Sequence, residues 1–177
     1  MRLVITLAGE NRPELIMELT RLVKECKCTI LESRMTELED DFAAHMMVEA
    51  NWNHIVRLED SLEAFGNRYP LKIQHLRGRE TPKNEEEQAA LPYAVDIVAG
   101  DQLENIHELA EFFFNRDIRV IDVSTSRYPA PFSASPLFLA HLIVIIPSQL
   151  KIVSLRDDFL EFCDQQNLDA ILEPIKR

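Results

Sequence analysis

Two histidines recur within the same short pattern and are the first candidates for chemistry in this chain. His45 lies in residues 42–48 and His141 in residues 138–144, and the two segments share Phe, Ala, His and Val in the same order. An imidazole can act as an acid or base or can bind a metal ion, but a metal site needs further ligands nearby. We interpret both histidines as mid-sheet residues that hydrogen-bond to neighbours. A small enzyme that uses His45 or His141 remains the alternative.

A second candidate is the polar turn at residues 9–15, which follows an apolar run and precedes a helical pattern. Asn11 is expected to cap the helix, and Pro13 is expected in its first turn. The free N–H groups at a helix N-terminus attract anions, so an amino-acid carboxylate suits this place. A plain capped turn is the alternative. The predicted ligand-binding residues are Gly9, Asn11, Arg12, Pro13, Glu14 and Leu15.

The remaining sequence offers little catalytic chemistry. Four glycines are too few for a glycine-rich phosphate loop, and neither a His-Glu-x-x-His nor a Gly-x-Ser-x-Gly pattern occurs. Cys26, Cys28 and Cys163 form no disulfide framework or metal-binding spacing, and we interpret them as small buried thiols. We therefore predict that the protein is not an enzyme and has no catalytic residues, no metal site and no cofactor.

Charge and composition narrow the class of partner. The chain has 177 residues, 46% of them hydrophobic, and a formal net charge of -11. Direct nucleic-acid binding needs a basic face, so a role in gene regulation would require another protein. Residues 1–6 lack signal-peptide features, and the longest apolar run, residues 137–146, is about half of a membrane span. We expect a soluble, cytoplasmic protein that contacts no membrane.

The chain contains an internal repeat. Gly9 and Ser33 match Gly100 and Ser124 at an offset of 91, and the histidine segments match at an offset of 96. Residues 55–60 match residues 152–157 at an offset of 97. The change in offset places an insertion between residues 124 and 138, where three prolines and two serines predict a loop.

Each copy of the repeat reads as β-α-β-β-α-β. This order, with one apolar stripe on each helix, predicts an α+β fold of two tandem ferredoxin-like units, each an antiparallel sheet with both helices on one face. The expected domains are residues 1–79 and 92–177, joined by a linker at 80–91. The expected strands are 3–8, 29–38, 42–50, 71–76, 93–99, 118–127, 137–146 and 168–172. The expected helices are 15–26, 55–65, 106–113 and 152–162, with residues 66 and 67 ending the second of these.

One sheet face of the second unit is unusually apolar. Strand alternation puts Phe138, Ala140, Leu142 and Val144 beneath the helices. The residues left on the uncovered face are Leu139, His141, Ile143 and Ile145. We predict that this stripe packs against the first unit or another subunit of a homo-oligomer, because exposed apolar stripes mark interaction surfaces. Coverage by the linker or by the loop at 129–136 is the alternative.

The turn and the repeated unit together resemble the ACT domain, a small-molecule regulatory module. Its usual turn, Gly-x-Asp-Arg-Pro-Gly-aliphatic, is matched by Gly9, Arg12, Pro13 and Leu15, with Asn11 for Asp and Glu14 for the last Gly. Two such units filling the chain are similar to the glycine cleavage system transcriptional repressor family. Residues 18–23, 30–35 and 51–53 support that similarity.

The resemblance implies a non-catalytic repressor-like regulator that works through protein–protein contact with a DNA-binding transcriptional activator of glycine cleavage genes. It also implies binding of a small amino acid, glycine, beside the turn. Glu14 departs from the pattern, and its carboxylate is expected to oppose a ligand carboxylate at the same N–H groups. Residues 100–104 of the second unit lack the Arg-Pro pair. An amino-acid sensor of other metabolism remains a further alternative.

Overall fold

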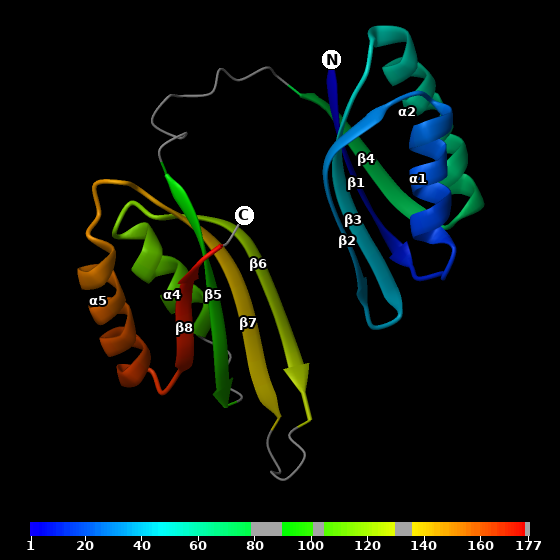
Figure 1. Ribbon diagram of the computed structural model, residues 1–177. Helices are drawn as coiled ribbons and strands as arrows, with labels where there is room; N and C mark the ends of the chain where they lie inside the picture. The colour runs from blue at the N-terminus through cyan, green and yellow to red at the C-terminus, as the bar shows by residue number, and fades with distance from the viewer. Residues whose placement is uncertain (79–89, 101–104, 130–135, 176–177) are drawn as a thin grey trace. The chain divides into compact units, whose positions relative to one another are not determined.

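The chain forms two compact units in the computed structural model (Figure 1), residues Met1–Pro82 and Lys83–Arg177. The structure describes residues 1–78, 90–100, 105–129 and 136–175. The linker expected at 80–91 lies almost entirely outside these ranges, as does most of the loop expected at 129–136. The domain boundaries therefore stay a prediction, and each unit is described by itself.

The first unit has the expected order of elements. Its sheet order is β2-β3-β1-β4, and all its strand pairs are antiparallel. Both helices lie on one face of the sheet (Figure 1). Its elements are β1 (Arg2–Glu10), α1 (Leu15–Glu25), β2 (Thr29–Leu38), β3 (Asp41–Glu49), α2 (Trp52–Arg68) and β4 (Leu71–Gly78).

The second unit repeats this arrangement, with sheet order β6-β7-β5-β8 and again both helices on one face (Figure 1). The prediction of two tandem ferredoxin-like units is confirmed. The elements are β5 (Leu91–Gly100), α4 (Asn105–Phe114), β6 (Arg119–Tyr128), β7 (Leu137–Ile146), α5 (Ile152–Gln165) and β8 (Asp169–Pro174).

Each unit buries its own core between the sheet and the helices. In the first unit Leu15, Leu19 and Val23 form the buried stripe of α1, at the spacing the sequence predicts. In the second unit Leu142 and Val144 of β7 are buried, together with the other members of a separate cluster. The two clusters share no residue. Each unit therefore has a hydrophobic core of its own, as a separately folded domain requires.

Helix α2 is longer than the sequence predicts. It begins after Asn51, whose side-chain oxygen accepts a hydrogen bond from the His54 N–H at 3.0 Å. It does not end at Gly66 but continues to Arg68. The buried ring of Tyr69 then packs on Phe65, with centroids 4.8 Å apart, so burial of an aromatic residue outweighs the helix-ending tendency of Gly66.

The sheet registers correct one part of the repeat alignment. Gly9 lies opposite Phe42 in the first unit, and the residue opposite Phe138 in the second unit is Ala99. The first strands are therefore related by an offset of 90, and Gly9 corresponds to Ala99 rather than to Gly100. The connections differ where the insertion is expected, since β2 and β3 are joined by residues 39–40 and β6 and β7 by residues 129–136.

No helix in the described ranges is long and apolar enough to cross a membrane.

Candidate functional site

The turn after β1 is held to the neighbouring hairpin rather than to the helix that follows. The Asn11 N–H donates to the Asp40 carbonyl oxygen at 2.8 Å, and Asn11 Nδ2 donates to Glu37 Oε1 at 2.9 Å. The prediction that Asn11 caps the helix is wrong, because these bonds engage its side chain with β2. The residue at the N-cap position is Glu14, whose side chain makes no capping hydrogen bond.

Arg12 and Pro13 lie in a separate turn before α1. The Arg12 carbonyl accepts a hydrogen bond from the Leu15 N–H at 3.0 Å, and α1 begins at Leu15. Pro13 therefore precedes the first helical turn instead of lying within it. The Arg12 guanidinium is 4.0 Å from Glu10 Oε2, and both side chains are largely exposed. Such an exposed pair leaves the guanidinium open to an added anion.

Gly9 is required by packing at the start of β4. A Cβ atom placed on Gly9 would lie 2.5 Å from the Pro70 carbonyl oxygen and 3.0 Å from Leu71 Cδ2. The first of these contacts involves backbone, which cannot easily move. The absence of a side chain at Gly9 therefore lets β4 pair closely with β1. Leu15, the last residue of the predicted site, is a core residue that anchors the turn.

The charges around this turn are mixed. Glu14 stands at the positive end of the α1 dipole, where a carboxylate is favourable. Glu18 lies in the first turn of α1 and pairs with Arg21. A ligand carboxylate would therefore meet Arg12 as an attractive group and Glu14 as a competing one. The corresponding residues 101–104 of the second unit lie outside the described ranges.

The two repeated histidines have different surroundings on the uncovered sheet faces. His141 Nδ1 lies 2.6 Å from Asp96 Oδ1, and Ser124 of β6 stands opposite His141 on its other side. His45 is exposed and has Thr6 and Arg34 as its cross-strand neighbours. A Ser-His-Asp row contains the residue types of a hydrolase triad, but no hydrogen bond among the described residues joins Ser124 to His141, as nucleophile activation requires.

Neither a metal site nor a reactive thiol is found among the His, Cys, Asp and Glu residues in the described parts of the chain. No three His, Cys, Asp or Glu residues in these parts come together as a metal site would require. Cys26 and Cys163 are buried, as expected, while Cys28 is partly exposed. Burial raises the pKa of Cys163 to about 12, which keeps it a thiol at neutral pH.

The uncovered face of the second unit carries the predicted apolar stripe. Leu139, Ile143 and Ile145 are partly exposed on β7, and Leu139 pairs with Val98 of β5, which is 39% exposed. The His141–Asp96 pair lies between Leu139 and Ile143 on this face. In the described part of this unit, the apolar side chains of the stripe stay partly exposed to solvent, and a partner packed on this face would bury them.

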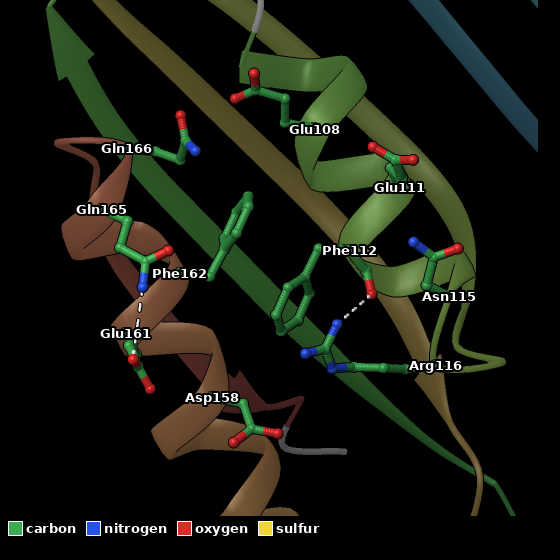
Figure 2. Close-up of a pocket in the computed structure, with 10 residues that line it drawn as sticks. All are labelled: Glu108, Glu111, Phe112, Asn115, Arg116, Asp158, Glu161, Phe162, Gln165 and Gln166. Atoms are coloured by element: carbon green, nitrogen blue, oxygen red, sulfur yellow. Dashed lines mark hydrogen bonds between the residues drawn. The ribbon is translucent and has the colours of Figure 1, made fainter.

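A groove of about 600 Å³ runs between α4 and α5, and the sequence analysis missed it (Figure 2). Carboxylates from both helices, and carboxamides at or just after their C-terminal ends, surround two phenylalanine rings. The signal in the sequence is a polar stripe at helical spacing beside the core positions of each helix. The residues that line the groove are Glu108, Glu111, Phe112, Asn115, Arg116, Asp158, Glu161, Phe162, Gln165 and Gln166.

Comparison with known proteins agrees with the fold and the turn. Residues 1–75 match the family model of the ACT domain. The glycine cleavage system transcriptional repressor of Escherichia coli K12 is 24% identical over 173 residues, which cover 98% of this chain and 90% of that protein.

Two solved structures share the fold along the whole chain. A protein of unknown function from Galdieria sulphuraria has a TM-score of 0.77 at 19% identity and covers 99% of this chain and 98% of its own. A protein assigned provisionally as a glycine cleavage system transcriptional repressor has a TM-score of 0.71 at 23% identity, with the same coverage.

These features define a protein of two tandem ferredoxin-like units, the first of which matches the ACT domain. Over nearly its whole length the chain is similar to the glycine cleavage system transcriptional repressor of Escherichia coli.

Proposed function

We propose that this protein regulates glycine cleavage genes without catalysis, by contact with a DNA-binding transcriptional activator. The observation that carries the proposal is the relationship to the Escherichia coli repressor over 98% of the chain. The net charge of -11 supports an indirect route, because an acidic protein is repelled by phosphates and attracted to a basic DNA-binding protein.

Binding of the activator is the direct test. The full chain should bind the purified activator of glycine cleavage genes in calorimetry, and it should lower transcription from a reporter driven by that activator. An activator that binds its DNA equally in the presence and absence of this protein, and shows no heat of association with it, would contradict the proposed function.

The second part of the proposal is that a small amino acid, glycine, controls this contact from the turn at Gly9, Asn11, Arg12, Pro13, Glu14 and Leu15. Thermal unfolding with glycine, serine and the other amino acids tests this part. A ligand at 100 times its Kd adds about 2.7 kcal/mol to the free energy of unfolding, which is a shift of several degrees. A shift selective for an amino acid other than glycine would indicate a sensor of other metabolism.

Glu14 provides a specific variant for the ligand site. Glu14→Gly removes the carboxylate that competes for the N–H groups at the start of α1, so glycine should bind about tenfold more tightly, a change of about 1.4 kcal/mol. Calorimetry measures this affinity, and Glu63→Gly, an exposed change on the other helix of the same unit, is the control. Equal affinities for Glu14→Gly and the unchanged protein would argue against ligand binding at this turn.

The predicted interface stays part of the proposal. We place a subunit contact of a homo-oligomer on Leu139, His141, Ile143 and Ile145, because their burial removes apolar surface from water. The experiment for this interface is given with the whole-molecule predictions below.

A further inference from the structure

The groove between α4 and α5 combines an aromatic floor with an acidic rim. The rings of Phe112 and Phe162 lie with centroids 4.9 Å apart at its base (Figure 2). Carboxylates stand on both sides of these rings, two from each helix. They belong to Glu108, Glu111, Asp158 and Glu161.

Among the described residues that line the groove, Arg116 is the one cation, and its guanidinium is already engaged. Arg116 Nη1 donates to the Phe112 carbonyl oxygen at 3.1 Å, and its guanidinium carbon lies 3.8 Å from the centre of the Phe112 ring. Within the described ranges, none of the four carboxylates forms a salt bridge, although Glu161 accepts a 3.5 Å hydrogen bond from Gln165. The groove therefore has an excess of unneutralised negative charge.

The first unit has the same groove with different chemistry. There α1 and α2 enclose about 290 Å³, and Arg21 pairs with both Glu18 and Glu25. Arg68 also lines this groove. The carboxylates of Glu18 and Glu25 are therefore balanced by the two guanidinium groups of Arg21 and Arg68.

The repeat offsets of 90 and 97 align the two grooves residue by residue. Arg21 corresponds to Glu111, Ser61 to Asp158 and Ala64 to Glu161. Because both units have the same fold, the fold itself does not require the acidic rim.

We propose that the α4–α5 groove docks a basic segment of a partner protein, whose arginine side chains pair with the rim carboxylates and stack on Phe162. Arginine is suited to this place because it forms charge-assisted hydrogen bonds with carboxylates and stacks on aromatic rings. Arg116 on Phe112 is an example of the same stacking within the chain. The proposal deepens the proposed function, since it names the surface and the chemistry of the partner contact.

Charge also decides against other occupants. A second copy of this chain carries the same net charge of -11, and its approach to an acidic groove would be repelled. A nucleic acid would be repelled for the same reason. A basic protein segment is therefore the occupant that this groove fits.

A labelled peptide tests the groove directly. The probe is a capped alanine-based helical peptide with arginines along one face, and the same peptide with glutamine in place of arginine is its control. Fluorescence anisotropy with the full chain at physiological ionic strength should show saturable binding of the arginine peptide alone. Spermidine at matched charge concentration should not displace it, since a diffuse cation lacks the stacking contacts.

Variants that give the groove the chemistry of the first unit test its specificity. Glu111→Arg with Asp158→Ser should weaken peptide binding by about tenfold or more, because both close charge pairs are lost. Glu161→Ala, a milder and exposed change, should weaken it by about threefold. The matched control, Glu63→Arg with Asp60→Ser on exposed positions of α2, makes the same change in net charge and should leave affinity within about twofold.

The outcomes separate this proposal from the proposed function. Equal loss in the groove and control variants, binding of the glutamine peptide, displacement by spermidine, or no binding at all would each overturn the docking groove. If the unchanged protein binds the activator and the groove variants bind it equally, the groove is wrong and the regulatory function stands. If the activator does not bind the unchanged protein, the regulatory function is wrong, and the peptide titration alone decides the groove.

Discussion

At the scale of single residues, the ACT turn combines structural and chemical roles that the motif alone does not separate. Gly9 lies against the backbone of Pro70, Asn11 ties the turn to Glu37 and Asp40, and Leu15 belongs to the core. Arg12 and Glu14 are left as the residues whose charge can act on a ligand. Gly9, Asn11 and Leu15 therefore have structural roles in the turn and the sheet.

Gly9 offers a test of this structural role. Gly9→Ala places a methyl group against the Pro70 carbonyl, so the free energy of unfolding should fall by about 1–3 kcal/mol in chemical denaturation. Gly100→Ala is the matched control, since a Cβ there meets no atom within 4 Å and stability should hardly change. Similar stability of the two variants would show that Pro70 and Leu71 move aside without cost.

Glu59 links stability to pH. Arg77 donates two hydrogen bonds to Glu59, at 3.0 and 2.7 Å, and together with its charge this lowers the pKa of Glu59 below the ordinary 4.5. A lowered pKa in the folded state stabilises the protein above pH 4.5, and this contribution is lost as the pH falls through the folded-state pKa. Glu59→Gln should therefore lower the melting temperature at pH 7 and reduce the steepness of its decline in acid.

The control for Glu59 is Glu63→Gln, an exposed position on the same helix. It should leave the melting curve at pH 7 and its acid dependence close to those of the unchanged protein. If the melting temperatures of Glu59→Gln and of the unchanged protein fall equally steeply as the pH is lowered, the contact between Glu59 and Arg77 does not persist in solution.

At the scale of elements, three helices end in the same way without the usual glycine. After α1, the Cys28 N–H donates to the Val23 carbonyl and the Lys27 N–H to the Lys24 carbonyl, with Lys27 at φ 56°. Asp117 after α4 and Asn167 after α5 adopt φ values of 56° and 54°. This is the Schellman pattern, whose left-handed position favours glycine and tolerates asparagine.

Lys27 is the position where this conformation is least favourable. Lys27→Gly should raise the free energy of unfolding by about 0.5–1 kcal/mol, because glycine reaches positive φ without a steric penalty. Asn167→Gly should raise it by less, since asparagine already tolerates the left-handed region. Denaturant titration of both variants measures the difference, and a larger gain at Asn167 would contradict this account.

At the scale of the whole molecule, the duplicated units have diverged on their surfaces while keeping their cores. The helix groove is charge-balanced in the first unit and acidic in the second. The uncovered sheet face has an exposed His45 in the first unit and a His141 bonded to Asp96 within an apolar stripe in the second. Such divergence is expected when two copies of one fold take on different contacts.

The apolar stripe predicts self-association through the second unit. Ile143→Thr with Ile145→Thr keeps β-branched side chains in β7 but removes apolar surface, so the protein should shift to a smaller species in light scattering. Val153→Thr, at a position that is 70% exposed on α5, should leave the mass unchanged. A Thr double variant with the mass of the unchanged protein would remove these residues from the interface.

The order of elements, the duplication and the core residues could be predicted from the sequence because they depend on local apolar periodicity, which the tertiary structure preserves. The insertion between β6 and β7 was also predictable, since proline-rich segments rarely continue a strand. The resemblance to the ACT domain rested on the turn at Gly9 to Leu15 together with the repeat, and residues 1–75 match the model of that domain.

Only the tertiary structure decided the details that depend on contacts between distant segments. Strand pairing showed that Gly9 corresponds to Ala99, and the hairpin drew Asn11 away from the helix. The α4–α5 groove likewise exists only when residues about 50 positions apart pack side by side, as Phe112 and Phe162 do. Sequence periodicity assigns a residue to a face of its own element, whereas register and packing determine which residues of other elements it meets.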